Sequence, residues 1–357
     1  MVVKRKRPKP FLIIIITIAI LLILMASLWI YLESPVDSKS DTNIEVIIPT
    51  GTSTKEIADI LKEKRLIKSK LFFQIYIKIN NKKSLKASNY IMKPNMSLEE
   101  ITNILEKGNS YNPNVITITF KEGKRITDYA KEIAEYTIHD YDEILTILSD
   151  KQYAATLIQK YWFLTDDILQ EGIYYPLEGY LAPDTYNFEN QTVSVETIVE
   201  TMLDQTMHNL EKYKSQLNTD IHYYVTMASI VELEGTNTKN RKMIVGVFEN
   251  RLKSGMNLGS DVTTYYALQH PMTKDLTTEQ FATVNPYNTR STTMMGKMPI
   301  GPICNPSTSS LEASINKTDN NYLYFVADKN GKIYYTSTLA DHNATVKEIK
   351  EKGDWIW

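Results

Sequence analysis

The longest apolar run of the chain lies near its N-terminus, at residues 11–32, and it contains no charged side chain. At 1.5 Å per helical residue this run spans about 33 Å, which is enough to cross a lipid bilayer. Basic residues crowd the segment before it, whereas the acids Glu33 and Asp37 follow it. The positive-inside rule therefore predicts a single-pass transmembrane helix, with residues 1–10 as a cytoplasmic tail and the rest of the chain extracytoplasmic.

A cleaved signal peptide is the alternative, because it also begins with basic residues followed by an apolar segment. Its apolar core is about 7–15 residues long and ends at small residues in an Ala-x-Ala-like site. Here the run is longer, and the apolar residues Leu28, Trp29 and Ile30 follow the small pair Ala26 and Ser27. The pattern favours an uncleaved anchor in the cell membrane.

Two short strand–turn–helix patterns follow a polar linker. Residues 44–49 have strand character and lead to an amphipathic helix that begins near Ser53. Residues 87–92 form the second predicted strand, and Ser97, with a glutamate three residues later, begins a second helix through a capping box. Units of this size resemble a LysM-like glycan-binding module, which we place at 44–110.

The remaining pattern, over 115–357, predicts a larger domain in which helices and strands are mixed. A strand at 115–120 precedes a helix at 126–136, and helical periodicity continues to about residue 169. Residues 322–327 and 332–337 flank a turn and predict a β-hairpin. The expected fold class is α+β, with an N-terminal transmembrane helix, a small LysM-like α/β subdomain and a larger α+β domain.

One predicted helix of this larger domain, ending in the sequence ASIVELEG, finishes in acids where basic residues are usual. Carboxylates at a helix C-terminus meet the negative end of the helix dipole, at a cost of about 0.3–1 kcal/mol each. Partial burial adds to this effect, and both raise the pKa of a carboxyl group. A carboxylic acid that stays protonated near neutral pH is suited to general-acid cleavage of a glycosidic bond. A solvated helix end is the alternative interpretation of this segment alone.

The two acids of this segment, Glu232 and Glu234, are about 200° apart around a helix, so they are not expected to face the same cleft. Residues Ile221, Val225 and Ala228 form an apolar face that also contains Glu232. This pattern selects Glu232 as the candidate acid. It predicts that Glu234 is solvated or paired with a cation.

Composition excludes several classes of function. The 357 residues are 43% hydrophobic and 23% charged, as in an ordinary globular protein, and a net charge of −2 gives no electrostatic case for nucleic-acid binding. A single cysteine, Cys304, excludes an intramolecular disulfide. With five histidines and no metal-binding spacing, the sequence predicts neither a metal nor another cofactor.

Six motifs, in this order, resemble those of the MltG-like (YceG-like) endolytic murein transglycosylases: LEGYLAPDTYNF, ASIVELEG, VFENRLKSGMNLGSD, NPYNT, IGPICNP and YLYFVAD with a later HN. The resemblance runs from the anchor to near the C-terminus. It implies that Glu232, the first glutamate after Ala-Ser-Ile-Val, is the catalytic acid. It also implies a substrate-binding cleft that draws on Glu178, Tyr180, Asp184, Tyr186, Asn250, Arg251, Ser260, Asp261, Tyr287, Asn288 and Asn305.

The same resemblance implies a membrane-anchored lyase that cuts the MurNAc–GlcNAc β-1,4 links of peptidoglycan glycan strands. In the expected mechanism, Glu232 protonates the glycosidic oxygen and then takes the proton of the MurNAc C6 hydroxyl, which closes a 1,6-anhydro ring. Water is not consumed. The implied partners are glycan strands, the membrane and peptidoglycan synthases, beside which the enzyme would terminate growing strands.

Two other functions remain open from the sequence. A muramidase would use Glu232 with a second acid about 5–9.5 Å away, for which Glu178 and Asp184 are the candidates, and it would leave reducing ends. A non-catalytic scaffold would hold synthases at the wall through the LysM-like module and the anchor. The closing pair His342 and Asn343 matches the family pattern and is as consistent with a structural role as with a functional one.

Overall fold

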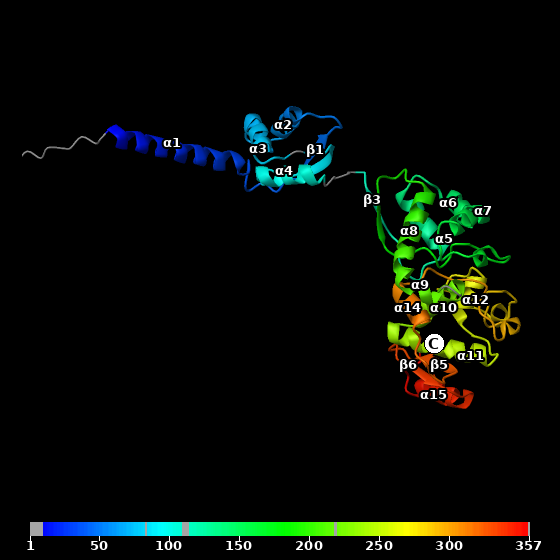
Figure 1. The fold of residues 1–357 in the computed structure, drawn as a ribbon. Coiled ribbons are helices and arrows are strands. Elements are labelled where there is room, and N and C mark those ends of the chain that lie inside the picture. Colours follow the sequence, from blue (N-terminus) through cyan, green and yellow to red (C-terminus); the bar gives the residue numbers. More distant parts are fainter. Residues whose placement is uncertain (1–9, 83, 109–113, 218–219, 356–357) are drawn as a thin grey trace, which may run out of the picture. The chain divides into compact units, whose positions relative to one another are not determined.

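The computed structural model describes residues 10–82, 84–108, 114–217 and 220–355 (Figure 1). The chain divides into two compact units, Met1–Pro113 and Asn114–Trp357. Both combine helices with two-stranded antiparallel sheets, so the predicted mixture of helix and sheet is confirmed.

Helix α1 (Pro10–Glu33) is the apolar N-terminal segment, and its length and composition fit a membrane span. Its last turns pack against the rest of the first unit. The ring of Trp29 meets that of Phe72 edge-on, with centroids 4.8 Å apart, and the Tyr76 hydroxyl donates to Glu33 Oε1 over 3.2 Å. Lys68 Nζ donates to the Tyr31 carbonyl over 2.7 Å. The helix is thus held against the small domain that follows it.

This small domain pairs strand β1 (Ile44–Ile48) with β2 (Ser88–Met92), and three helices cover the sheet: α2 (Thr54–Glu63), α3 (Lys70–Ile79) and α4 (Leu98–Lys107). Ser53 and Ser97 each begin a helix through a capping box. Helix α3 had no counterpart in the sequence prediction, since its aromatic and β-branched residues are as typical of strands.

The first half of the second unit builds a helical core beside strands β3 (Ile116–Thr119) and β4 (Thr185–Phe188). These strands pair antiparallel, with Ile118 opposite Tyr186. The helices around them are α5 (Ile126–Tyr136), α6 (Tyr141–Ser149), α7 (Lys151–Ile158), α8 (Val195–Leu210) and α9 (Lys214–Leu217). Their apolar faces meet in one cluster, which also receives Val225 and Ala228 of the next helix.

The second half is built around helix α10 (Ile221–Glu234), which packs against α11 (Thr238–Lys253) and α14 (Thr308–Ile315) (Figure 1). The short helices α12 (Asp261–Ala267) and α13 (Thr278–Phe281) lie in the connection between α11 and α14. Strands β5 (Tyr324–Ala327) and β6 (Ile333–Thr336) form the predicted hairpin, and α15 (Leu339–Glu351) packs against it.

Helix α10 is buried on all sides, in contrast to the one-sided apolar face expected from its sequence. Val225 and Ala228 join the core of the first half, whereas Met227, Ile230 and Val231 join a second cluster with α11 and α12. Such a helix carries apolar residues around its whole circumference. The position of an acid on the Val225 face therefore does not determine whether it reaches a cleft.

Candidate functional site

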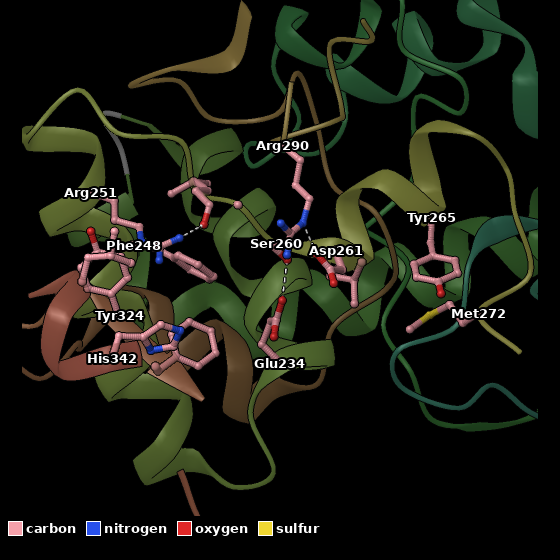
Figure 2. Close-up of a pocket in the computed structure, with 15 residues that line it drawn as sticks. Glu234, Phe248, Arg251, Ser260, Asp261, Tyr265, Met272, Arg290, Tyr324 and His342 are labelled. Carbon is pink, nitrogen blue, oxygen red and sulfur yellow. Dashed lines mark hydrogen bonds and ion pairs between the residues drawn. The ribbon is translucent and has the colours of Figure 1, made fainter. Parts of the chain in front are cut away.

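A cavity of about 590 Å³ opens at the C-terminal end of α10 (Figure 2). It is enclosed by the ends of α10 and α11, the start of α12, the 290 loop, strand β5 and helix α15. Its lining residues are Glu234, Phe248, Arg251, Leu258, Gly259, Ser260, Asp261, Val262, Tyr265, Met272, Arg290, Tyr324, Phe325, Leu339 and His342.

Glu234 is the acid that α10 presents to this cavity. Figure 2 shows its carboxylate opposite Ser260, whose hydroxyl donates a hydrogen bond of 2.6 Å to Oε1. Burial raises the pKa of Glu234, and the nearby carboxylate of Asp261 acts in the same direction. The Ser260 hydrogen bond and the positive charges of Arg290 and Arg251 act against this shift. The net result is a carboxyl group that favours its protonated form more than an ordinary glutamate does.

Two arginines frame the cavity, and each has a defined partner. Arg290 forms an ion pair with Asp261. Arg251 donates through Nε to the Leu323 carbonyl over 2.6 Å. Gly259 has a φ of +65°, a conformation that favours glycine. A Cβ at this position would also lie only 3.0 Å from Arg251 Nη1, so glycine lets the backbone approach the guanidinium closely.

Aromatic rings form another part of the cavity wall. The rings of Tyr324 and His342 stack with centroids 5.4 Å apart. Burial, with the charge of Arg251, lowers the pKa of His342 and favours the neutral imidazole. Within the described ranges, Nδ1 of His342 is buried without a hydrogen-bond partner. This part of the wall is therefore aromatic, with one buried imidazole nitrogen that has no partner among the described residues.

Glu232 lies outside this cavity, and both oxygens of its carboxylate accept hydrogen bonds from other protein groups. Oε1 accepts from Arg241 Nη2 over 2.8 Å, and Oε2 accepts from the Ser307 backbone N–H over 2.9 Å and from its hydroxyl over 2.6 Å. The side chain of Glu232 is 4% exposed and that of Arg241 is 14% exposed. The ion pair joins the last turn of α10 to α11, and the Ser307 hydrogen bonds join it to the start of α14.

The two glutamates therefore have the opposite environments from those expected. The sequence predicted that Glu232 faces the cleft and that Glu234 is solvated or paired with a cation. Instead, Glu232 is paired with a cation in the interior, and Glu234 is hydrogen-bonded to a hydroxyl at the cavity wall. Because α10 is buried on both faces, its apolar pattern did not indicate which acid reaches the cavity.

Three of the predicted cleft residues line the cavity with Glu234, namely Arg251, Ser260 and Asp261. Others are buried in polar contacts elsewhere. Asn305 Oδ1 accepts from the backbone N–H groups of Gly179 and Leu181, and Asn288 Nδ2 donates to the carbonyls of Phe281 and Thr283. Such buried amides hold loops in place and have no groups left for a ligand.

The remaining predicted cleft residues also lie outside the cavity. Asn250 Nδ2 donates to the carbonyls of Asn320 and Tyr322, and Asp184 is exposed beside strand β4. The tyrosines among them are packed in the interior, with their partners in the fold: Tyr180, Tyr186 and Tyr287. Most of the predicted cleft residues therefore lie outside the cavity, and most of these are buried parts of the scaffold.

Glu178 was expected in the cleft but is 1% exposed. Its carboxyl accepts from the Ile126 backbone N–H over 3.0 Å and from the Tyr266 hydroxyl over 3.1 Å, and Asn305 Nδ2 donates to it over 3.3 Å. Burial raises the pKa of Glu178 to about 8, although the bonds from Tyr266 and Ile126 and the charge of Arg125 oppose the shift. Glu178 is a buried acid that joins α5, α12 and the 305 loop.

This burial predicts a pH dependence of stability. A carboxyl whose pKa is higher in the folded state stabilises the fold below its unfolded pKa of 4.5, and this stabilisation is lost as the pH rises through about 8. Glu178→Gln removes the titrating group and should flatten that slope. Thermal unfolding of both proteins from pH 5 to 9 tests this expectation, and parallel curves for the two proteins would contradict it.

Several lining residues were missed from the sequence, namely Tyr265, Met272, Arg290 and Tyr324, and the role of His342, which also lines the cavity, was left open. Tyr324 and His342 fall in the last of the six motifs, which was a signal that they share a site. Arg290 follows the NPYNT motif directly. Within the described ranges, no group of three or more His, Cys, Asp or Glu side chains is placed to hold a metal ion.

Comparisons with known proteins match this chain over most of its length. The model of the YceG-like family matches residues 46–348. An endolytic murein transglycosylase of Bacillus subtilis is 36% identical over 332 residues, which are 90% of this chain and 89% of that protein. An endolytic murein transglycosylase of Streptococcus pneumoniae is 34% identical over 88% of this chain, which spans 60% of that longer protein.

Among solved structures, a yceG-like protein from Listeria monocytogenes has a TM-score of 0.61 and 36% sequence identity to this chain. The match covers 85% of this chain and 99% of that protein. Family model, curated relatives and solved structure agree, and the chain belongs to the YceG-like family.

Proposed function

We propose that this protein is an endolytic lytic transglycosylase that cuts MurNAc–GlcNAc β-1,4 links in peptidoglycan and leaves 1,6-anhydro-MurNAc ends. The observation that carries the proposal is the carboxyl group of Glu234, which lies at the wall of a polar and aromatic cavity and has a raised pKa. The names of the relatives from Bacillus subtilis and Streptococcus pneumoniae support the same reaction.

In the first step, the protonated Glu234 carboxyl donates its proton to the bridging oxygen while the bond from that oxygen to C1 of MurNAc breaks. The GlcNAc unit leaves with the bonding electron pair as an alcohol. Positive charge develops on the MurNAc ring, and the oxygen of its own N-acetyl group stabilises it. The Ser260 hydroxyl, 2.6 Å from Oε1, stabilises the carboxylate that Glu234 becomes.

In the second step, the Glu234 carboxylate accepts the proton of the MurNAc C6 hydroxyl as that oxygen bonds to C1. The 1,6-anhydro ring closes, and Glu234 regains the proton with which it began. Neither step consumes water or requires a cofactor. Tyr324 and His342 offer aromatic surface for the sugar, and Arg251 is held beside the Tyr324 ring.

A two-carboxylate muramidase is the second candidate, because Asp261 also lines the cavity. Its carboxylate is already engaged in an ion pair with Arg290. The acids first considered for this role are unsuited to it: Glu178 is buried among protein groups, and Asp184 lies outside the cavity. This arrangement favours one acid acting twice.

We also assign roles to the other parts of the chain. Helix α1 anchors the protein in the cell membrane, and the basic residues before it place the N-terminus in the cytoplasm. Residues 44–110 form a LysM-like glycan-binding subdomain, and residues 115–357 form the catalytic domain outside the membrane. From this position the enzyme ends growing glycan strands beside peptidoglycan synthases.

The products of cleavage test the proposal. Full-length protein in detergent is expected to release fragments with 1,6-anhydro-MurNAc ends from intact glycan strands, as read by mass spectrometry. Reducing MurNAc ends would instead show a muramidase. A folded protein that binds strands without cutting them would be a scaffold.

A further inference from the structure

A second cavity, of about 610 Å³, lies on the other side of the end of α10. Leu233 lines this cavity, whereas the next residue, Glu234, lines the first. Met272 belongs to the walls of both. The two cavities are thus neighbours, with the last turn of the helix that carries the proposed acid between them.

The lining of this second cavity is cationic. Lys124, Arg125 and Lys131 contribute positive charges, and Asp128 is the one acid in its wall. In the described part of the chain, neither Lys124 nor Arg125 forms a salt bridge, and Lys131 lies 3.6 Å from Asp128 in an exposed pair. Exposed pairs of this kind contribute little energy, so Lys124 and Lys131 remain available to an anionic ligand.

The backbone that carries these cations is fixed against the core. Gly123 N–H donates to the Asn305 carbonyl over 2.8 Å, and Asn305 N–H donates to the Lys124 carbonyl over 2.9 Å. The Arg125 guanidinium lies 5.3 Å from the centre of the Tyr266 ring, and its Nη2 donates to the His270 carbonyl over 3.4 Å. A cationic group held in this way loses little freedom when it binds a ligand.

We propose that the second cavity binds the anionic stem peptide of the glycan strand whose glycosidic bond lies at Glu234. This inference rests on the proposed function. A glycan strand is longer than one cavity, and the lactyl peptide on each MurNAc projects sideways from it. Its carboxylates are anions that guanidinium and ammonium groups bind through charge-assisted hydrogen bonds. Tyr141 and Tyr175 add aromatic surface for the peptide backbone and its methyl groups.

Three strand preparations test the proposal with the full-length protein in detergent. One carries stem peptides with free carboxylates, one carries amidated stem peptides, and one has lost its peptides to an amidase. At limiting substrate, the wild-type protein should cleave the first about tenfold faster than the stripped strands. The double variant Lys124→Ala/Lys131→Ala should bring this ratio of rates close to one, and Arg125→Gln should also lower the ratio.

Lys239→Ala is the matched control, because Lys239 is an exposed lysine of the same unit that lines neither cavity. It should keep the wild-type ratio. Amidated strands should behave like stripped strands if carboxylates are recognised. A preference that persists with amidated strands and is competed by inorganic phosphate would overturn the proposal in favour of a phosphate site.

The outcomes separate this inference from the proposed function. A wild-type protein that produces no anhydro ends from any of the three preparations would contradict the proposed function. If the wild-type protein cleaves the strands and the double variant keeps the wild-type ratio, the stem-peptide site alone is overturned. The same holds if the double variant loses equal activity on peptide-bearing and on stripped strands.

Discussion

Glu234→Gln is expected to lower the rate of glycan-strand cleavage by about 10²–10⁴-fold, the usual contribution of a general acid. The amide has the shape of the carboxyl but supplies no proton, and it still accepts the Ser260 hydrogen bond. The fold should therefore keep its stability. The rate of formation of anhydro ends and the unfolding temperature of the same preparation measure the two effects.

Glu232→Gln is the matched control, since it makes the same chemical change two residues earlier. Because Glu232 lies in an interior ion pair outside the cavity, this variant should keep most of its activity and lose stability. If Glu232→Gln instead abolishes cleavage while Glu234→Gln remains active, the acid is the one that the family resemblance implied.

Arg241→Met is expected to destabilise the second unit by about 3–5 kcal/mol, because it leaves the Glu232 carboxylate buried without its cation. In a domain of this size, about 2–4 °C of unfolding temperature is lost per kcal/mol. Arg241 also donates to the Gly235 carbonyl and to the Ser309 hydroxyl, so the end of α10 loses further bonds. Thermal unfolding measures the loss.

Lys160→Met breaks an exposed pair with Glu200, whose atoms are 2.6 Å apart, and should cost less than about 1 kcal/mol. The double variant Glu232→Gln/Arg241→Met should regain part of the loss, because neither buried charge remains. An Arg241→Met protein as stable as the Lys160→Met protein would show that the interior pair contributes no more than a surface pair.

The sequence predicted the elements better than it predicted the site. A capping box located α4, and apolar periodicity located α2 and α5, because each of these helices has one buried face. Helix α3 lacked so clear a signal. Its buried aromatic residues, Phe72, Phe73 and Tyr76, do not distinguish a helix from a strand.

At the site, the resemblance pointed to helix α10, whose end lines the cavity, but it did not identify which glutamate of that helix reaches the cavity. That distinction depends on Arg241 and Ser307, which reach Glu232 from α11 and α14. Contacts between distant segments also explain why Asn288 and Asn305 appeared to be ligands. An asparagine in a polar loop has the same sequence signal whether it binds substrate or satisfies buried backbone groups.

The packing of Trp29 on Phe72 has a consequence for how the proposed anchor orients the small domain. Each helical residue advances the chain by 1.5 Å and turns it by about 100°. One residue inserted into α1 before Trp29 would therefore rotate the small domain by about 100° relative to the lipid-embedded part of the helix. Extra residues in the segment after Glu33 would leave that angle unchanged, because the contacts of Trp29 and Tyr31 fix it before the segment begins.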